Sequence, residues 1–149
     1  MTDIIAILED DQRRTEAMRD ALSARLPHAE AVFFDNAPDM IAWLKDHLAA
    51  VRLICLDHDL GPTSRRGEVI LDPGTGRDVA DFLAGRRPSC PVLIHSSNID
   101  AARAMRLLLE EHDWPTERVS PVDDLAWISA LWLPAVAGLL DQPPQEHAP

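Results

Sequence analysis

Apolar positions along the chain follow two alternating patterns. Short continuous apolar runs with many β-branched residues are typical of strands buried on both faces of a sheet. Such runs, with a shorter and more polar fifth, occupy residues 3–8, 29–34, 51–57, 90–95 and 117–120. After each run, apolar residues recur at three- and four-residue intervals, which indicates a helix packed along one side. The helices expected from this spacing cover residues 11–26, 37–48, 75–83, 99–112 and 123–140.

Turn-forming residues separate these elements. Pro27 closes the first helix, and Asp35 or Asn36 is expected to cap the second. Pro134 falls inside the last helix and predicts a kink or a break there. The proline-rich polar stretch 141–149 is expected to be disordered, so residues 1–140 are expected to form one domain.

The alternation of strands and helices predicts an α/β fold. Five strand–helix units favour a parallel sheet covered by helices on both faces. Right-handed crossovers leave few ways to wind them, and the common flavodoxin-like winding has the strand order 2-1-3-4-5. In that order, a crevice opens beyond the carboxyl ends of the first and third strands.

Acidic side chains collect at this expected crevice. Glu9 and Asp10 come at the end of the first strand, Asp57 ends the third, and Asp59 follows it. Two unit charges about 4 Å apart repel by roughly 4 kcal/mol at an effective dielectric of about 20, so such a cluster needs a proton or a cation. A few carboxylate oxygens suit Mg²⁺ or Mn²⁺. We therefore expect a divalent-metal site for phosphoryl chemistry; the alternative is that these acids are solvated turn and cap residues.

Polar residues also end the fourth strand, in the stretch "LIHSSN" at residues 93–98. The hydroxyls of Ser96 and Ser97, together with the backbone N–H groups that open the next helix, suit phosphate oxygens. The same serines would serve equally well as helix caps. His95 and His58 are candidates for a general acid and base. Period-two alternation points His95 away from Ser96, so a packed structural histidine is an equal alternative for that residue.

The charge and cysteine content of the chain restrict the kinds of partner and the setting that we expect. The chain has 14 Lys and Arg against 25 Asp and Glu, a net charge of −11, which argues against broad binding to nucleic acid or to an anionic membrane. It leaves room for one phosphate at a local site. The first apolar run is too short for a signal peptide or a membrane span, and no membrane contact is expected. Cys55 and Cys90 lack metal-type spacing and are expected to be buried, which fits a reduced, cytoplasmic setting.

Taken in order, these stretches resemble the receiver domain of two-component response regulators. The acidic pair of that family is matched by Glu9 and Asp10, and its phosphoacceptor aspartate by Asp57. Ser96 matches the serine or threonine that ends the fourth strand, and Asp59 falls where the family holds the metal through a backbone carbonyl. The resemblance covers residues 4–140 and implies a divalent cation, a kinase and a partner protein.

Two departures from ordinary receivers stand out. Ser120 occupies the position where the family has a lysine before proline, and the only lysine, Lys45, falls on the expected second helix. The segment Gly61–Gly76 is a long loop for a receiver, and long loops in compact domains tend to be functional or mobile. It carries Arg65 and Arg66, whose planar side chains suit phosphate oxygens. The alternative for this pair is simple solvation.

A closer resemblance is to the cyclic-phosphate-processing receiver family, through "LDHDLG", a long insert with "GTG", and "HSSN". It implies action on the cyclic phosphate ends of nucleotides or RNA. Carried over to this sequence, its motif places the site at six residues: Asp57, His58, Asp59, His95, Ser96 and Asn98. In this interpretation Asp57, His58, His95 and Ser96 are catalytic. Ser96, Asn98, Arg65 and Arg66 would bind phosphate.

Three functions stay open. As an enzyme, the protein would hold a cation between Asp10 and Asp57, with Glu9 in support. It would open a cyclic phosphodiester of a small molecule or of a nucleic-acid end. As a receiver, it would accept phosphate on Asp57 from a kinase and signal to a partner protein.

The third function is a pseudo-receiver that only binds partners. The last helix presents large apolar residues that would face either the core or an interface: Trp127, Ile128, Leu131 and Trp132. A homodimer through the last two helices would fit this interpretation.

Overall fold

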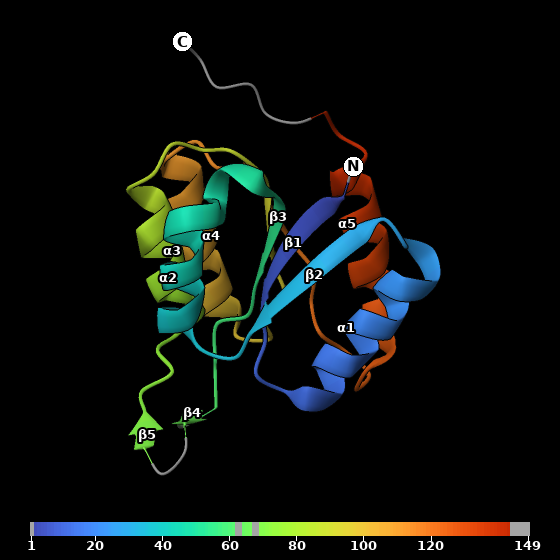
Figure 1. The fold of residues 1–149 in the computed structure, drawn as a ribbon, viewed down its shortest axis with the longest axis horizontal. Coiled ribbons are helices and arrows are strands. Elements are labelled where there is room, and N and C mark those ends of the chain that lie inside the picture. The colour runs from blue at the N-terminus through green and yellow to red at the C-terminus, as the bar shows by residue number, and fades with distance from the viewer. Residues whose placement is uncertain (1, 62–63, 67–68, 144–149) are drawn as a thin grey trace.

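The computed structural model describes residues 2–61, 64–66 and 69–143. Its main sheet has five parallel strands in the order β2-β1-β3-β6-β7 (Figure 1). The strands are β1 (Asp3–Leu8), β2 (Ala29–Phe34), β3 (Val51–Leu56), β6 (Val92–Ile94) and β7 (Thr116–Arg118). The order confirms the predicted flavodoxin-like winding. The fourth and fifth strands of the sheet are shorter than predicted, and the fifth begins one residue earlier.

Helices cover both faces of the sheet (Figure 1). On one face lie α1 (Gln12–Arg25) and α5 (Leu133–Leu140), and on the other lie α2 (Ala37–His47), α3 (Gly76–Ala84) and α4 (Ile99–Glu111). A 3₁₀ turn, η1 (Leu48–Ala50), follows α2. Asn36 caps α2 by accepting a 2.8 Å hydrogen bond from the N–H of Asp39, which decides between the two predicted caps.

Strand alternation divides the core into two layers. Ile7, Cys55 and Leu93 pack towards α1 and α5, whereas the following residues of the same strands pack towards α2, α3 and α4. Both sets are fully buried. The continuous apolar runs of the sequence are therefore explained by strands that have helices on each side.

The predicted interruption near Pro134 takes the form of a π-helical turn, η2 (Ile128–Trp132). The N–H of Leu133 bonds to the carbonyl of Ile128, five residues back. Proline has no N–H and its ring crowds the carbonyl four residues before it, so a wider turn ahead of Pro134 relieves the conflict. The helix also starts later than predicted, because Asp123 and Asp124 adopt positive φ angles of 55° and 56°.

The turn settles the orientation of the apolar residues in the last helix. Trp127, Ile128 and Trp132 are buried, and only Leu131 is exposed, at 43%. Three of the four side chains considered for an interface therefore belong to the core.

The segment between β3 and α3 was expected to be a loop, and this expectation was wrong. It contains an antiparallel hairpin of β4 (Ser64–Arg66) and β5 (Val69–Leu71), which extends beyond the carboxyl edge of the main sheet (Figure 1). The β-branched run at residues 69–71 was the available signal for a strand. The side chains of Arg65 and Arg66, predicted to bind phosphate, lie outside the described part of the structure.

At the amino edge of the sheet, Arg52 joins the start of β1 to the end of α5. Its Nη1 lies 3.1 Å from Oδ1 of Asp3, and its Nη2 donates to the carbonyls of Leu140 (3.1 Å) and Gln142 (3.2 Å). The predicted disordered tail is not tested, because residues 144–149 fall outside the described ranges. Within those ranges, no helix combines the length and apolar character needed to cross a bilayer.

Candidate functional site

The carboxyl ends of β1, β3 and β6 lie in register. Leu8 is opposite Leu56, and Leu56 is opposite Ile94. The next residue of each strand therefore falls in one row at the carboxyl edge of the sheet: Glu9, Asp57 and His95. By strand alternation this row faces the α1 and α5 side of the sheet, opposite to the preceding leucines and isoleucine.

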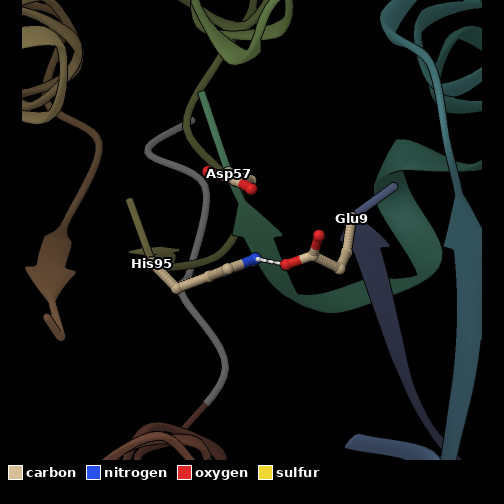
Figure 2. A group of neighbouring side chains, drawn as sticks. All are labelled: Glu9, Asp57 and His95. Carbon is tan, nitrogen blue, oxygen red and sulfur yellow. Dashed lines mark ion pairs between the residues drawn. The ribbon is translucent and has the colours of Figure 1, made fainter. Parts of the chain in front are cut away.

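The three side chains of this row form a compact buried group. One ligand atom from each lies within 4.8 Å of the others, and Nε2 of His95 lies 3.3 Å from Oε1 of Glu9 (Figure 2). Their relative exposures are 2% for Glu9, 5% for Asp57 and 0% for His95. Among the residues that the structure describes, no other three acids, histidines or cysteines come together in this way.

Burial and charge act differently on the two carboxyl groups. Burial raises the pKa of Asp57 to about 6, with Glu9 adding to the rise and His95 opposing it. Burial alone would also raise the pKa of Glu9. There, the adjacent His95, the N–H of Asp11 and Arg14 together outweigh burial and lower the pKa. The site therefore keeps Glu9 as a carboxylate beside an Asp57 that retains its proton until the pH rises to about 6.

Arg14, on α1, joins the group and was not singled out from the sequence. Its Nη1 lies 3.6 Å from Oε1 of Glu9 and 3.7 Å from Oδ2 of Asp57. Its guanidinium carbon lies 5.4 Å from the ring centroid of Trp127, and the same indole stacks on His95 at 5.9 Å. The available signal was helical spacing, since Arg14 is four residues before the buried Met18.

Asp10 and Asp59, the other predicted metal ligands, are not part of this group. A carboxylate oxygen of Asp10 accepts a hydrogen bond from the N–H of Gly61, and burial raises the pKa of Asp10. The side chain of Asp59 is 62% exposed and lies 2.8 Å from Nδ1 of His58. Its other oxygen accepts from Nδ2 of Asn98 at 3.4 Å.

The "HSSN" segment uses its polar groups to start α4. Oδ1 of Asn98 accepts from the N–H of Ala101 at 3.1 Å, and Oγ of Ser96 accepts from the N–H of Asn98 at the same distance. Ser96 is buried. Asn98, and not either serine, is therefore the N-cap of α4, whereas Ser96 bonds to the backbone just before the helix begins.

Comparisons with known proteins agree with this geometry. A family model described as "Cyclic-phosphate processing Receiver domain" matches residues 5–111. The chain belongs to this family. The structure of this receiver also resembles that of the phosphorylated cyanobacterial phytochrome response regulator RcpA, with 17% identity over 98% of this chain and 100% of that chain and a TM-score of 0.73. No curated protein matches the chain.

Two further solved structures share the receiver fold. A response regulator receiver domain from Rhodospirillum rubrum has 17% identity, covers 97% of this receiver and 99% of its own chain, and gives a TM-score of 0.66. The Mn²⁺-bound form of response regulator Rcp1 has 16% identity, 95% and 96% coverage, and a TM-score of 0.67. At these identities the likeness establishes the fold alone.

The residue that stands where ordinary receivers were said to have a lysine is Ser120, just after β7. Ser120 is exposed and its Oγ accepts from Nη1 of Arg118 at 3.1 Å. Nη2 of Arg118 in turn donates to the carbonyl of Ser96 at 2.7 Å. Lys45 lies on α2. Among the described side chains, the arginine that contacts Asp57 is instead Arg14, on α1.

Proposed function

We propose that this receiver binds a phosphate ester at the carboxyl edge of its sheet and hydrolyses a cyclic phosphodiester there. The observation that carries the proposal is the buried group of Glu9, Asp57 and His95, which the ends of three adjacent strands supply. The description of the family, in terms of processing cyclic phosphates, supports the same class of substrate.

The group suits a divalent cation. Nδ1 of His95 is buried without a hydrogen bond in the described part of the structure, and buried polar atoms normally have partners. Oε1 of Glu9 and Nε2 of His95 contact each other only at 3.3 Å, so both have lone-pair or donor capacity left. Carboxylates suit Mg²⁺ and Mn²⁺, and imidazole is a ligand typical of transition-metal ions. The similar receiver Rcp1 is known in a Mn²⁺-bound form. A cation held by Glu9, Asp57 and His95 would supply the positive charge that polarises the phosphodiester.

His58 is our candidate for proton transfer. Its Nδ1 lies 2.8 Å from Oδ1 of Asp59, which orients the ring and leaves Nε2 available. The side chain of His58 is 19% exposed, whereas that of His95 is fully enclosed. In the proposed step, a water oxygen bonds to phosphorus while its proton passes to Nε2 of His58. The P–O bond of the ring breaks, and the leaving oxygen takes that proton to give a phosphomonoester and a free hydroxyl.

The test is incubation of the protein with 2′,3′-cyclic AMP and Mg²⁺ or Mn²⁺. We expect the wild type to form a phosphomonoester and Asp57→Asn to form no product. The rate of His58→Ala should be at least about 100-fold lower than that of the wild type. His112→Ala is the matched control, because this exposed histidine is the C-cap of α4 and its Nδ1 bonds to the carbonyl of Leu108 in its own helix. Product formation no faster than in buffer would rule the proposal out.

A second candidate is phosphoryl transfer to Asp57. It is favoured by the position of this carboxylate, which directly follows the central strand β3 and is flanked by Glu9 and Arg14. Acetyl phosphate with Mg²⁺ should then add one phosphoryl group to the intact protein, and Asp57→Asn should prevent it. An unchanged mass would exclude this candidate and leave the hydrolase test unaffected.

A further inference from the structure

Two neighbouring arginines on α1 have different environments. Arg13 is 65% exposed and forms a 2.7 Å ion pair with Asp124. Arg14 is 24% exposed and faces the buried carboxyl groups of Glu9 and Asp57. The same residue type at adjacent positions therefore provides one surface ion pair and one cation inside the candidate site.

Within the described part of the chain, the contacts of Arg14 include no side-chain hydrogen bond. At 3.6 and 3.7 Å, both distances to the carboxylates exceed those of hydrogen bonds. The guanidinium is instead held over the ring of Trp127, which is 1% exposed and so gives it a fixed support. Nη1 of this planar, partly exposed group thus lies towards Glu9 and Asp57.

A phosphate ester at this edge needs such a cation. Glu9 and Asp57 repel an anion, and the chain as a whole carries a net charge of −11. Arg118 also lies near Ser96, where its two terminal nitrogens donate to Ser96 and Ser120. Of these two arginines, Arg14 is the one with ion-pair contacts to Glu9 and Asp57 in the described structure, so its cation lies at the carboxyl groups that a phosphate ester would approach.

We propose that Arg14 is the anion-binding residue of this site and donates to the phosphate oxygens of the bound ester, with Trp127 holding the guanidinium in place. This inference rests on the proposed function, because it assigns the ligand contact at the same site. A planar guanidinium can bind two phosphate oxygens at once, which a point charge on a flexible stem does less well.

An anion-binding role for Arg14 predicts different effects on the binding of a phosphate ester and on the binding of a divalent cation. Removal of the positive charge of Arg14 should weaken binding of a phosphate ester. It should leave binding of a divalent cation unchanged or make it tighter, because the guanidinium and the cation share Glu9 and Asp57. A merely structural role would weaken both together.

The experiment is calorimetric titration of the full chain with Mn²⁺ alone, and with 2′,3′-cyclic AMP in the presence of Mg²⁺. We expect Arg14→Gln to lose about tenfold to a hundredfold in affinity for the cyclic nucleotide, as for a lost charge-assisted contact, without loss of Mn²⁺ affinity. Arg14→Lys should recover part of the loss. Arg13→Gln, the matched control, should bind both ligands like the wild type. Thermal unfolding checks that each variant is folded.

Equal nucleotide affinity in Arg14→Gln and Arg13→Gln would overturn the assignment, as would parallel loss of both ligands or no nucleotide binding by the wild type. Wild-type protein that binds the cyclic nucleotide but does not hydrolyse it would instead contradict the proposed function. In that outcome, selective loss of binding in Arg14→Gln would still support the assignment.

Discussion

At the scale of single residues, the site depends on one register row. Sequence reasoning found Glu9, Asp57 and His95 separately, because each follows an apolar strand, but it could not tell which histidine meets the carboxylates. That depends on the pairing of β3 with β6, which places His95 level with Asp57. Arg14 was missed because it and Arg13 are chemically identical, and only the phase of α1 separates them.

The raised pKa of Asp57 predicts a dependence of stability on pH. The unfolded chain ionises this group near pH 3.9, whereas the folded protein retains the proton up to about pH 6. The stabilisation is therefore complete below about pH 4 and is lost as the pH rises through about 6. Relative to wild type, Asp57→Asn should be more stable at pH 8 by up to about 3 kcal/mol, and equally stable at pH 4.

Urea unfolding across this pH range measures the difference. Asp72→Asn is a suitable control, since Asp72 is exposed and follows β5, away from the buried group. A stability difference between Asp57→Asn and wild type that does not vary with pH would contradict the titration of Asp57.

At the scale of elements, the start of α3 packs directly against the end of β3. The N–H of Gly76 donates to the carbonyl of His58 at 3.0 Å, and a Cβ on Gly76 would lie 1.9 Å from the carbonyl oxygen of Asp57. No side chain fits there without moving the backbone of the site. The "GTG" stretch was recognised in the sequence as part of a motif, but the close approach that requires glycine is a tertiary contact that local pattern does not contain.

Gly76→Ala should therefore destabilise the fold by a few kcal/mol, as overpacking against rigid backbone does. It should also weaken divalent-cation binding, because the backbone at Asp57 must shift. Gly138→Ala is the control: it lies exposed in α5 with nothing within 4 Å of its Cβ, and should stabilise by about 0.5–1 kcal/mol. Chemical denaturation and metal titration measure both effects; wild-type values for Gly76→Ala would contradict the contact.

At the scale of the whole molecule, one sheet supports two separate apolar layers. The order of its strands followed from the sequence because alternation and crossover handedness restrict the winding. The hairpin and the shortness of β6 and β7 did not, since the length of a strand depends on the neighbours with which it pairs. Cys55 belongs to the layer beneath α1 and α5, and Cys90 to the layer beneath α2, α3 and α4.

The two cysteines predict how cooperatively these layers unfold. Burial raises the pKa of Cys90 to about 12 and that of Cys55 further, so neither thiol should react in the folded protein. In the single-cysteine variants Cys55→Ala and Cys90→Ala, we expect thiol labelling to appear at one common urea concentration, as in a two-state transition. Labelling of one position well before the other would show that the layers unfold separately.

The bridge that Arg52 makes between Asp3 and the backbone at Leu140 and Gln142 has a practical consequence. It gathers both ends of the described chain at the edge of the sheet remote from Glu9, Asp57 and His95. An affinity tag or a sensor surface attached near Asp3 or Gln142 would therefore leave the edge that carries the candidate site turned towards the buffer. Immobilised protein is thus a sound format for screening small phosphorylated compounds.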